Sequence, residues 1–274
     1  MTIKDIVLKY KENLKDITNI PSKEIEVLMG YILNKDIVWL HTNYNKVFSK
    51  EKELIKLIEK RSSGYPLEYI LSKVSFYGYD FFINENVLIP RPETELLIDN
   101  AVKILKDIQS PKVIEIGVGS GVISILLALL IQDIKIVAID INEDALKLAK
   151  KNAIKFKVDK NIEFIKSDLY HNINNIYFDM SISNPPYISN SYNLPLSVKY
   201  EPKNALFGGN RGDEILTNII NETYKRKIKY LCCEMGYDQK EYIIDTLKNF
   251  NIEKINFYQD YSSFNRGFYL EFKY

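Results

Sequence analysis

The first 75 residues show the hydrophobic spacing of short amphipathic helices. A first helix is predicted from apolar positions that recur every three or four residues, namely Ile3, Ile6, Val7, Tyr10, Leu14 and Ile17. Pro21 interrupts this pattern, and Ser22 is expected to cap a second helix with Ile25, Leu28, Met29 and Ile32 inward. A third helix is expected over residues 49–61, with Gly64 just past its end. Residues 1–75 are therefore predicted to form a small helical domain.

The segment that follows has the pattern of a β-hairpin. Residues 73–89 contain short runs of Val, Phe, Tyr and Ile around Gly78 and Asn84. Pro90 and Pro92 then hold the chain extended, because proline fixes its own φ and disfavours helix at the residue before it. Residues 76–92 are thus expected to connect the helical domain to a second domain over residues 93–274.

The second domain alternates between apolar runs and helical spacing. It opens with a helical pattern over residues 94–105, and helical stretches are expected after Gly121 and over residues 143–156, 213–226 and 239–249. The apolar runs lie at residues 112–116, 134–140, 161–165, 177–183, 229–234, 255–260 and 267–272. This alternation predicts an α/β fold with a mostly parallel, doubly wound sheet of seven strands. Turn residues between the last two runs favour an antiparallel hairpin at the C-terminal end.

Charge and composition exclude several classes of function. The 37 Lys and Arg residues nearly balance the 36 Asp and Glu residues, so no stable nucleic-acid binding is expected. The longest apolar stretch, residues 121–131, is far shorter than the roughly 20 residues of a membrane-spanning helix. The N-terminal residues lack the features of a secretory or transit peptide, so the expected location is the cytoplasm. The two adjacent cysteines are too few for a disulfide framework or a zinc site, and no metal is expected.

A glycine-rich loop lies between the first predicted strand of the sheet and the helix after it. Glu115 is the second-last residue of the strand, and Gly117, Gly119 and Gly121 alternate with Val118 and Ser120. Such a loop lets a ligand approach the backbone closely, although a turn without a ligand has the same appearance. A dinucleotide fingerprint needs its third glycine one position later, where this chain has Val122. The spacing therefore favours S-adenosylmethionine over NAD.

Two carboxylates end the next two predicted strands. Asp140 is placed to accept hydrogen bonds from both hydroxyls of a ribose, and Asp168 is placed to accept one from an adenine amino group. Either residue is also a common helix cap. Because parallel strands end at the same edge of a sheet, both carboxylates are expected near the glycine loop.

The most specific motif is Asn184-Pro185-Pro186-Tyr187, which follows the run at residues 177–183. The prolines stiffen the loop and donate no hydrogen bonds, which leaves the Asn184 side-chain oxygen and the Pro185 carbonyl as acceptors. Two such acceptors match the two N–H bonds of a planar NH2 group. The Tyr187 ring can pack on a flat substrate group and near a sulfonium charge. The motif therefore indicates methyl transfer to an amide or aryl nitrogen.

These residues identify a family resemblance. The chain resembles the release factor glutamine methyltransferases, the PrmC or HemK family, which methylate the glutamine of the GGQ motif in class 1 peptide-chain release factors. The similar segments are residues 88–95, 115–121, 140, 167–168, 184–187, 201–202, 234–236, 260–261 and Arg266, after a helical N-terminal domain. The resemblance implies a Rossmann-like methyltransferase domain, release factors as partners, and S-adenosylhomocysteine as the second product.

The resemblance also assigns roles to the motif residues. It implies that Gly117, Val118, Gly119, Ser120 and Gly121 line the methionine part of the cofactor. Asp140 would hold the ribose, Asp168 with Leu169 the adenine, and Glu115 would steady the loop or bind the methionine ammonium. Asn184, Pro185, Pro186 and Tyr187 would hold the glutamine amide, with Asn184, Pro185 and Tyr187 catalytic and Asn184 also touching the cofactor. Val118 replaces the usual Thr and Leu169 a frequent aromatic residue, so only their backbone contacts are expected.

Three alternatives stay open from the residues. A sister family that methylates a glutamine of a ribosomal protein shares the NPPY motif, and only its partner surface differs. A DNA methyltransferase could present a flipped adenine NH2 to the same acceptors, although no target-recognition insert is evident. The third alternative is a binding module without activity. We expect a monomeric enzyme, with the helical domain docking the protein substrate and no catalytic role for His171.

Overall fold

The computed structural model describes residues 1–174 and 176–274 and divides into two compact units. The first unit contains Met1–Lys73 together with Leu194–Tyr200, and the second contains Val74–Asn193 and Glu201–Tyr274. The seven residues Leu194–Tyr200 therefore belong to the first unit, although the residues on either side of them belong to the second. Within the described part of the chain, no helix is long and apolar enough to cross a membrane.

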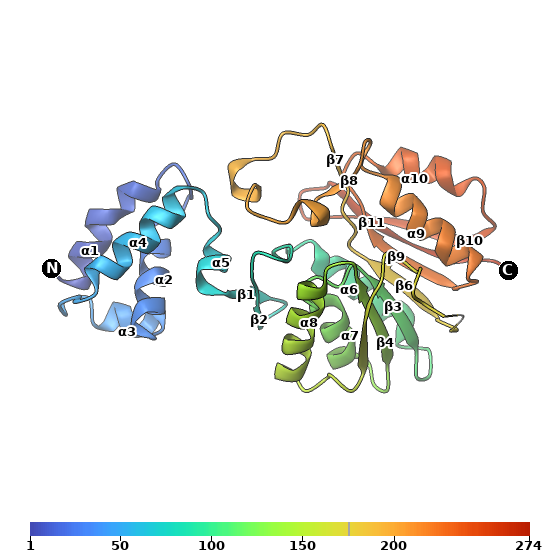
Figure 1. The fold of residues 1–274 in the computed structure, drawn as a ribbon, viewed down its shortest axis with the longest axis horizontal. Helices are drawn as coiled ribbons and strands as arrows, with labels where there is room; N and C mark the ends of the chain where they lie inside the picture. The colour runs from blue at the N-terminus through green and yellow to red at the C-terminus, as the bar shows by residue number, and fades with distance from the viewer. Residues whose placement is uncertain (175) are drawn as a thin grey trace. The chain divides into compact units, whose positions relative to one another are not determined.

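The first unit is helical, and Figure 1 shows its part Met1–Lys73 in blue to cyan. Its elements are α1 (Ile3–Tyr10), a 3-10 turn η1 (Lys11–Leu14), α2 (Pro21–Leu33), α3 (Ile37–Thr42), α4 (Glu51–Ser62), α5 (Leu67–Leu71) and η2 (Leu196–Val198). The predicted apolar stripes supply its core, where Ile6, Leu14, Ile25, Leu28 and Leu54 are fully buried. The helical character predicted for this segment is confirmed.

The ends of these helices differ in part from the prediction. The first helix stops at Tyr10 and tightens into η1, although the same apolar face continues to Leu14. Ser22 does not cap α2, because Pro21 occupies the first helical position and Ile20 is the N-cap. Proline suits that position because its missing N–H would have no partner there. The short helices α3 and α5 were not predicted, since one or two turns carry little periodic signal.

The segment Leu194–Tyr200 packs on the end of α4. The Leu196 side chain lies so close to Gly64 that a Cβ on this glycine would sit 2.5 Å from Leu196 Cγ. Gly64 also has a φ of +91°, a backbone conformation that other residues rarely adopt. The rings of Tyr65 and Tyr200 meet edge to face at 5.2 Å, and the Tyr200 hydroxyl donates to the Ser63 carbonyl at 3.1 Å. Gly64 thus lies just past the end of α4 and, because it has no side chain, leaves room for Leu196 of this segment.

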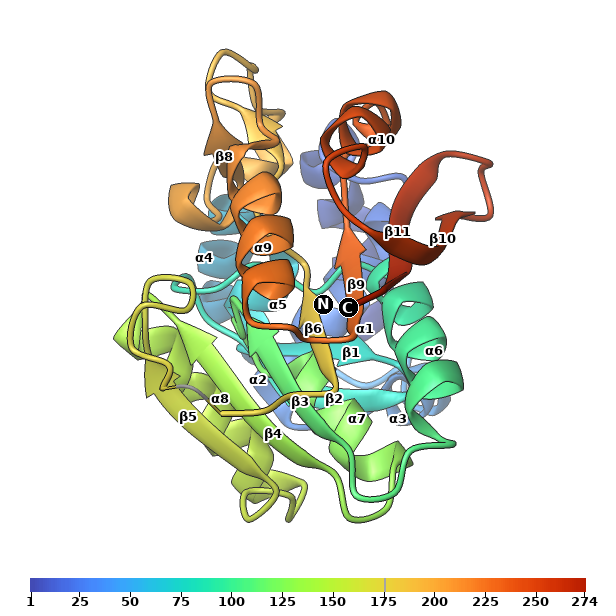
Figure 2. The same ribbon diagram turned by 90° about the vertical axis from the view of Figure 1, so that its right-hand side faces the viewer.

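The second unit is built on a seven-stranded sheet in the order β10-β11-β9-β6-β3-β4-β5, which Figure 2 shows face on. The strands are β3 (Lys112–Ile116), β4 (Lys135–Asp140), β5 (Ile162–Lys166), β6 (Met180–Ser183), β9 (Tyr230–Glu234), β10 (Ile252–Gln259) and β11 (Asn265–Phe272). β9, β6, β3, β4 and β5 run parallel, whereas β11 pairs antiparallel with both β9 and β10. The predicted α/β class and the C-terminal antiparallel hairpin are confirmed.

Two smaller sheets lie beside this one. The hairpin of β1 (Lys73–Phe76) and β2 (Tyr79–Phe82) is confirmed, with Gly78 in its turn. β7 (Ile188–Ser189) and β8 (Phe207–Gly209) form a short parallel pair between the predicted strand at residues 177–183 and the predicted helix at residues 213–226, with the turn η3 (Lys203–Ala205) just before β8. Strands of two or three residues are too short for the sequence pattern to reveal.

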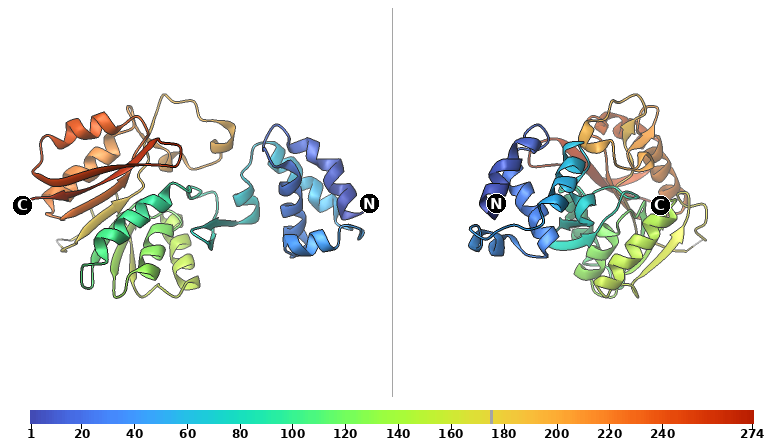
Figure 3. Two further views of the ribbon diagram at one scale, coloured as in Figure 1. Left: turned by 180° about the vertical axis from the view of Figure 1, so that it is seen from behind. Right: turned by 60° about the vertical axis from the view of Figure 1, so that its left-hand side comes forward.

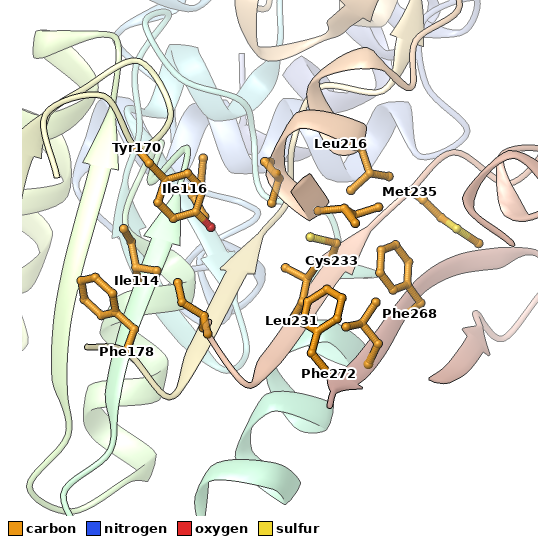
Figure 4. Packing of buried hydrophobic residues seen from close by; sticks show 14 of the residues in the cluster. Ile114, Ile116, Tyr170, Phe178, Leu216, Leu231, Cys233, Met235, Phe268 and Phe272 are labelled. Carbon is orange, nitrogen blue, oxygen red and sulfur yellow. The ribbon is translucent and has the colours of Figure 1, made fainter. Parts of the chain in front are cut away.

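Helices cover both faces of the large sheet. They are α6 (Thr94–Leu105), α7 (Val122–Leu130), α8 (Glu143–Lys155), α9 (Glu214–Lys225) and α10 (Lys240–Leu247). Figure 3 shows the first three of them, in green, together on one side of the sheet. On the other face, Ile114 and Ile116 of β3 pack with Leu216 of α9 in the core that Figure 4 shows. Strand alternation then points Glu115 toward α7.

Cys232 and Cys233 are free and buried in β9, as expected from the composition. Cys233 belongs to the core cluster with Met235 and Phe268. Burial raises the pKa of the Cys233 thiol well above its usual value, because a thiolate is poorly solvated there. Both cysteines therefore act as small core side chains.

Candidate active site

A cavity of about 310 Å³ lies at the carboxyl edge of the parallel strands. Its walls come from residues that follow β3, β4, β5 and β6, together with residues 86–88, Pro90 and Thr94. The predicted residues that line it are Glu115, Gly117, Val118, Gly119, Ser120, Asp140, Asp168, Leu169, Asn184, Pro185 and Pro186. Two predicted site residues, Gly121 and Tyr187, do not line the cavity, although each is next to a lining residue in the sequence. The structure thus brings four separate motifs together in one cavity.

The glycine loop gives the cavity an open backbone wall. Gly117 and Gly119 have φ values of +76° and +52°, and a Cβ on either would meet nothing within 4 Å. The N–H groups of Gly117 and Val118 both donate to the Ile139 carbonyl at 2.9 Å, which holds the loop against β4. Gly121 has a different role, because a Cβ there would sit 3.0 Å from that of Ala149 on α8. The first two glycines leave room for a ligand, and the third lets two helices approach.

Glu115 places a buried carboxyl at the base of this loop. Its Oε2 accepts a hydrogen bond from the Ser124 N–H at 3.0 Å and another from the Ser124 hydroxyl. Its Oε1 is buried and has no partner among the described residues. Burial raises the pKa of Glu115 to about 8, and the bonds from Ser124 oppose this rise. An acceptor without a partner therefore remains at a residue that lines the cavity.

Asp140 and Asp168 differ in how firmly they are held. Asp140 accepts the Gly119 N–H at 3.0 Å and the Asn142 N–H at 2.8 Å, and burial raises its pKa. Asn142, not Asp140, caps α8. The Asp168 side chain is 64% exposed, and Asp168 does not cap a helix in the described part of the chain. The helix-cap alternative therefore fails for both carboxylates.

The NPPY loop is tied to three different elements. The Ser183 hydroxyl, just before the loop, donates to the Ile116 carbonyl of β3 at 2.7 Å. The Asn184 Nδ2 group donates to the Thr94 hydroxyl oxygen at 3.1 Å, and the Gln239 Nε2 group donates to the Tyr187 carbonyl at 3.1 Å. Because Asn184 donates to Thr94, its side-chain oxygen remains an acceptor for other groups. The Asn184 oxygen is therefore available as an acceptor, and hydrogen bonds fix the loop to three neighbouring elements.

Tyr187 has a half-buried ring near several charged groups. Its pKa rises to about 12, first because of burial and then because of the nearby Glu234 carboxyl, while Arg266 and Arg91 act in the opposite direction. Glu234 itself is buried at the end of β9, and burial raises its pKa to about 7. The predicted substrate loop thus borders a cluster of charged groups that its own motif does not contain.

Sequence reasoning missed Thr94 and Gln239. Thr94 belongs to the Leu88–Glu95 segment that supports the family resemblance, but nothing in its spacing shows that it reaches Asn184. Gln239 accepts the Gly236 N–H at 2.8 Å while it donates to the Tyr187 carbonyl, so it links the turn after β9 to the NPPY loop. Arg91, left out of the predicted site, forms an ion pair with buried Glu201, which also accepts the Ile89 N–H at 3.0 Å.

Comparison with known proteins gives the same assignment for both units. Residues 5–71 match the PrmC N-terminal domain, and residues 92–197 match the methyltransferase small domain. The release factor glutamine methyltransferase of Dictyoglomus turgidum is 40% identical over 83% of this chain and 82% of that protein. The one from Buchnera aphidicola subsp. Baizongia pistaciae is 33% identical over 94% of this chain and 95% of that protein. The chain belongs to the release factor glutamine methyltransferase family.

Other matches differ in length or share only the fold. A bifunctional methyltransferase of Rickettsia typhi is 33% identical over 97% of this chain, which spans 56% of that protein. The human hMettl16 catalytic domain, solved with a 3′UTR hairpin, has a TM-score of 0.60 at 18% identity, over 72% of this chain and 77% of that one. A ribosomal protein L11 methylase from Lactobacillus delbrueckii subsp. bulgaricus has a TM-score of 0.50 at 18% identity, over 69% of this chain and 82% of that one.

Family membership confirms the predicted methyltransferase activity and the use of S-adenosylmethionine. The cavity also fits this cofactor on its own terms. Gly117 and Gly119 leave space for a ligand against the backbone. The unpartnered Oε1 of Glu115 suits a cationic ammonium group, and Asp140 and Asp168 present further acceptors along the same edge of the sheet.

Proposed function

We propose that this protein transfers a methyl group from S-adenosylmethionine to the side-chain amide nitrogen of the glutamine in the GGQ motif of class 1 release factors. In this role it supports translation termination. The observation that carries the proposal is that Asn184 lines the cavity while its amide N–H donates to Thr94, which leaves its side-chain oxygen available as an acceptor. This oxygen and the Pro185 carbonyl would accept the two N–H bonds of the glutamine amide.

The rate of this reaction depends mainly on how the amide nitrogen is positioned relative to the methyl group. An amide nitrogen is a poor nucleophile because its lone pair is delocalised into the carbonyl group. Holding it in line with the methyl group raises its effective concentration, and well-oriented reactants can lower the barrier by roughly 7–11 kcal/mol. Methylation would make the nitrogen strongly acidic, so the Asn184 side-chain oxygen or water would accept the proton that it loses. No histidine is needed as a base.

The remaining cavity residues would hold the cofactor, which supplies the methyl group from its sulfonium centre. The loop of Gly117 to Gly121, including Val118 and Ser120, would receive its methionine part, with Glu115 at the ammonium group. Asp140 would accept the ribose hydroxyls. Asp168 and the backbone of Leu169 would contact the adenine. Pro186 would keep the substrate loop stiff, and Tyr187 would pack its ring against the glutamine side chain.

Methyl transfer from labelled S-adenosylmethionine tests this function directly. The acceptors are a release factor, the same factor with its GGQ glutamine changed to alanine, a ribosomal protein, and duplex DNA. We expect label on the first acceptor alone, and we expect Asn184→Ala to remove it. Label on DNA would favour an adenine methyltransferase, and label on the ribosomal protein would favour the sister family. No label on any acceptor, with cofactor binding retained, would contradict the proposal.

We also propose that residues 1–75 dock the release factor, and that residues 76–92 connect them to the catalytic residues 93–274. The near balance of charges supports a protein partner rather than a nucleic acid. Hydrogen exchange on the intact protein, with and without release factor, should show new protection within residues 1–75. We further propose a cytoplasmic monomer, which light scattering of the purified enzyme would test.

A further inference from the structure

The fully buried side chain of Asn152 on α8 binds the backbone of two other segments. Its Oδ1 accepts the Phe82 N–H at 2.8 Å, and its Nδ2 donates to the Phe82 carbonyl at 3.0 Å and to the Ser120 carbonyl at 2.9 Å. A primary amide has one oxygen and two N–H bonds, so these three contacts engage every polar group of the side chain. Because a backbone N–H only donates and a carbonyl only accepts, the partners also determine the orientation of the amide.

Both partners of Asn152 lead to the wall of the cavity. Ser120 belongs to the glycine loop and lines the cavity itself. Phe82 ends β2 and does not line the cavity, but the chain continues from it to residues 86–88, which do. This connecting stretch is also held at its other end, because Asn142, the N-cap of α8, donates from its Nδ2 to the Asn86 carbonyl at 3.0 Å. α8 therefore holds both the glycine loop and the stretch that leads from the hairpin to the cavity.

Apolar packing brings α8 close to both segments. A Cβ on Gly121 would lie 3.0 Å from the Cβ of Ala149, so the end of the glycine loop lies directly against α8. On the side of the hairpin, the ring centroids of Phe81 and Phe156 lie 4.8 Å apart. Such contacts are not directional, whereas hydrogen bonds depend on both distance and angle. The hydrogen bonds of Asn152 are therefore suited to fix the position of the glycine loop relative to the hairpin.

We propose that Asn152 is a positioning residue that fixes the spacing between the glycine loop and residues 86–88 of the cavity wall, and thereby sets the affinity for the cofactor. Asn152 does not line the cavity, so it acts through the backbone that it holds. The inference rests on the proposed function in one respect, because it assumes that S-adenosylmethionine binds in this cavity with its methionine part at the glycine loop. Without Asn152, the binding of the cofactor would have to order these segments, and the free-energy cost of that ordering would lower the affinity.

Asn152→Asp tests the proposal in the full-length enzyme. It keeps the shape of the side chain and the oxygen that accepts the Phe82 N–H, but a second oxygen replaces the NH2 group and faces the carbonyl oxygens of Phe82 and Ser120. Asn152→Ser is the uncharged second variant, which decides the matter if Asn152→Asp does not fold. Its single hydroxyl has one proton and cannot replace both N–H bonds of the amide.

The matched control is Asn161→Asp, which removes the same kind of contact away from the cavity. Asn161 Nδ2 donates to the Ile134 carbonyl at 3.0 Å, and these two residues directly precede β5 and β4. Because the two strands run parallel, both residues lie at their amino ends, at the edge of the sheet opposite to the cavity. Asn161→Asp therefore reports what the loss of an amide-to-carbonyl hydrogen bond does to folding alone.

Calorimetric titration with S-adenosylhomocysteine measures affinity without turnover, at a temperature where circular dichroism shows each variant to be folded. We expect both Asn152 variants to bind about tenfold more weakly than the wild type, the effect of one lost orienting hydrogen bond. The affinity of Asn161→Asp should stay within about twofold of the wild type, although its thermal stability falls. At saturating S-adenosylmethionine, kcat of the Asn152 variants should stay within about threefold of the wild type, because the loss lies in cofactor binding.

An affinity within about twofold of the wild type in the Asn152 variants, or an equal loss of affinity in Asn161→Asp, would overturn the proposal, since Asn152 would then only stabilise the fold. A wild type that binds S-adenosylhomocysteine but methylates no release factor would instead refute the proposed function and leave the comparison of affinities valid. A wild type that does not bind S-adenosylhomocysteine would contradict the cofactor site on which both proposals rest.

Discussion

The buried carboxyl of Glu115 predicts a pH dependence of cofactor affinity. Burial raises its pKa to about 8, while Oε1 has no partner among the described residues. If the methionine ammonium of the cofactor binds at this oxygen, it binds the carboxylate form far better than the neutral form. The free enzyme holds Glu115 mostly protonated at neutral pH. Cofactor binding should therefore release a proton, and affinity should increase with pH.

The size of the effect follows from the pKa of Glu115. An acid with a pKa of about 8 is about 1% ionised near pH 6 and about 24% ionised near pH 7.5. The dissociation constant for S-adenosylmethionine should therefore fall by roughly 20-fold over this interval. The measurement stops near pH 7.5, because an α-amino group itself loses its proton at about pH 7.7–8.0.

Glu115→Gln is the matched variant. Its amide oxygen can still accept hydrogen bonds from Ser124, so the packing of α7 against β3 is preserved. The pKa of Asp140 is also raised, and any contribution from Asp140 should persist in Glu115→Gln. The part of the pH dependence of the dissociation constant that disappears in Glu115→Gln is thus the contribution of Glu115.

Isothermal titration calorimetry is the direct assay. Titrations in two buffers with different ionisation enthalpies measure the proton released on binding, and a series at different pH values gives the dissociation constants. A wild-type constant that does not change with pH, or equal slopes in wild type and Glu115→Gln, would refute the reasoning. In that case Glu115 only steadies the loop through its hydrogen bonds with Ser124, which Glu115→Gln retains.

Two further predictions concern stability. Gly64→Ala should cost about 1–2 kcal/mol from its positive φ alone, and more from the clash with Leu196. Urea unfolding and proteolysis within residues 194–200 should both detect this, whereas Gly78→Ala, with a φ of +75° and open space around it, should show the backbone cost only. Tyr170→Phe removes a buried hydroxyl that bonds Ser181 at 2.6 Å and Thr223 at 2.9 Å, and it should cost about 1–3 kcal/mol in urea unfolding. The control Tyr177→Phe, which removes an exposed bond to Asp179, should change stability by less than about 0.5 kcal/mol, and equal effects of the two tyrosine variants would contradict this view.

The fold of the second unit followed closely from the sequence because its signals are long and repeated. β3, β4 and β9 are nearly continuous apolar runs, as expected for strands with helices on both faces. In the first unit, the positions of buried residues were predictable, but the helix ends were not. There the capping box of Thr2 with Asp5, and Pro21 at a first helical position, decide where helices begin.

The cavity residues were predictable for a topological reason. Parallel strands carry their carboxyl ends to one edge, so Gly117, Asp140, Asp168 and Asn184 meet without any information about side-chain contacts. The contacts that fix the NPPY loop were not predictable. Thr94 and Asn184 are 90 residues apart, and Tyr187 and Gln239 are 52 residues apart. Local spacing carries no signal at such separations, so only the structure reveals these partners.

The NPPY loop is held in a way that suits a reaction governed by position. Its prolines restrict the backbone from within, and its contacts anchor it at both ends. Ser183 bonds to β3, Asn184 to α6, and the Tyr187 carbonyl to Gln239 before α10. These three anchors come from distant parts of the chain, so the loop takes its final geometry only when the sheet and both helices are assembled. A reactant misplaced by about 1 Å can lose about 100-fold in rate. If the NPPY loop holds the methyl acceptor as proposed, its attachment to the assembled core of its unit makes the geometry of methyl transfer depend on complete folding.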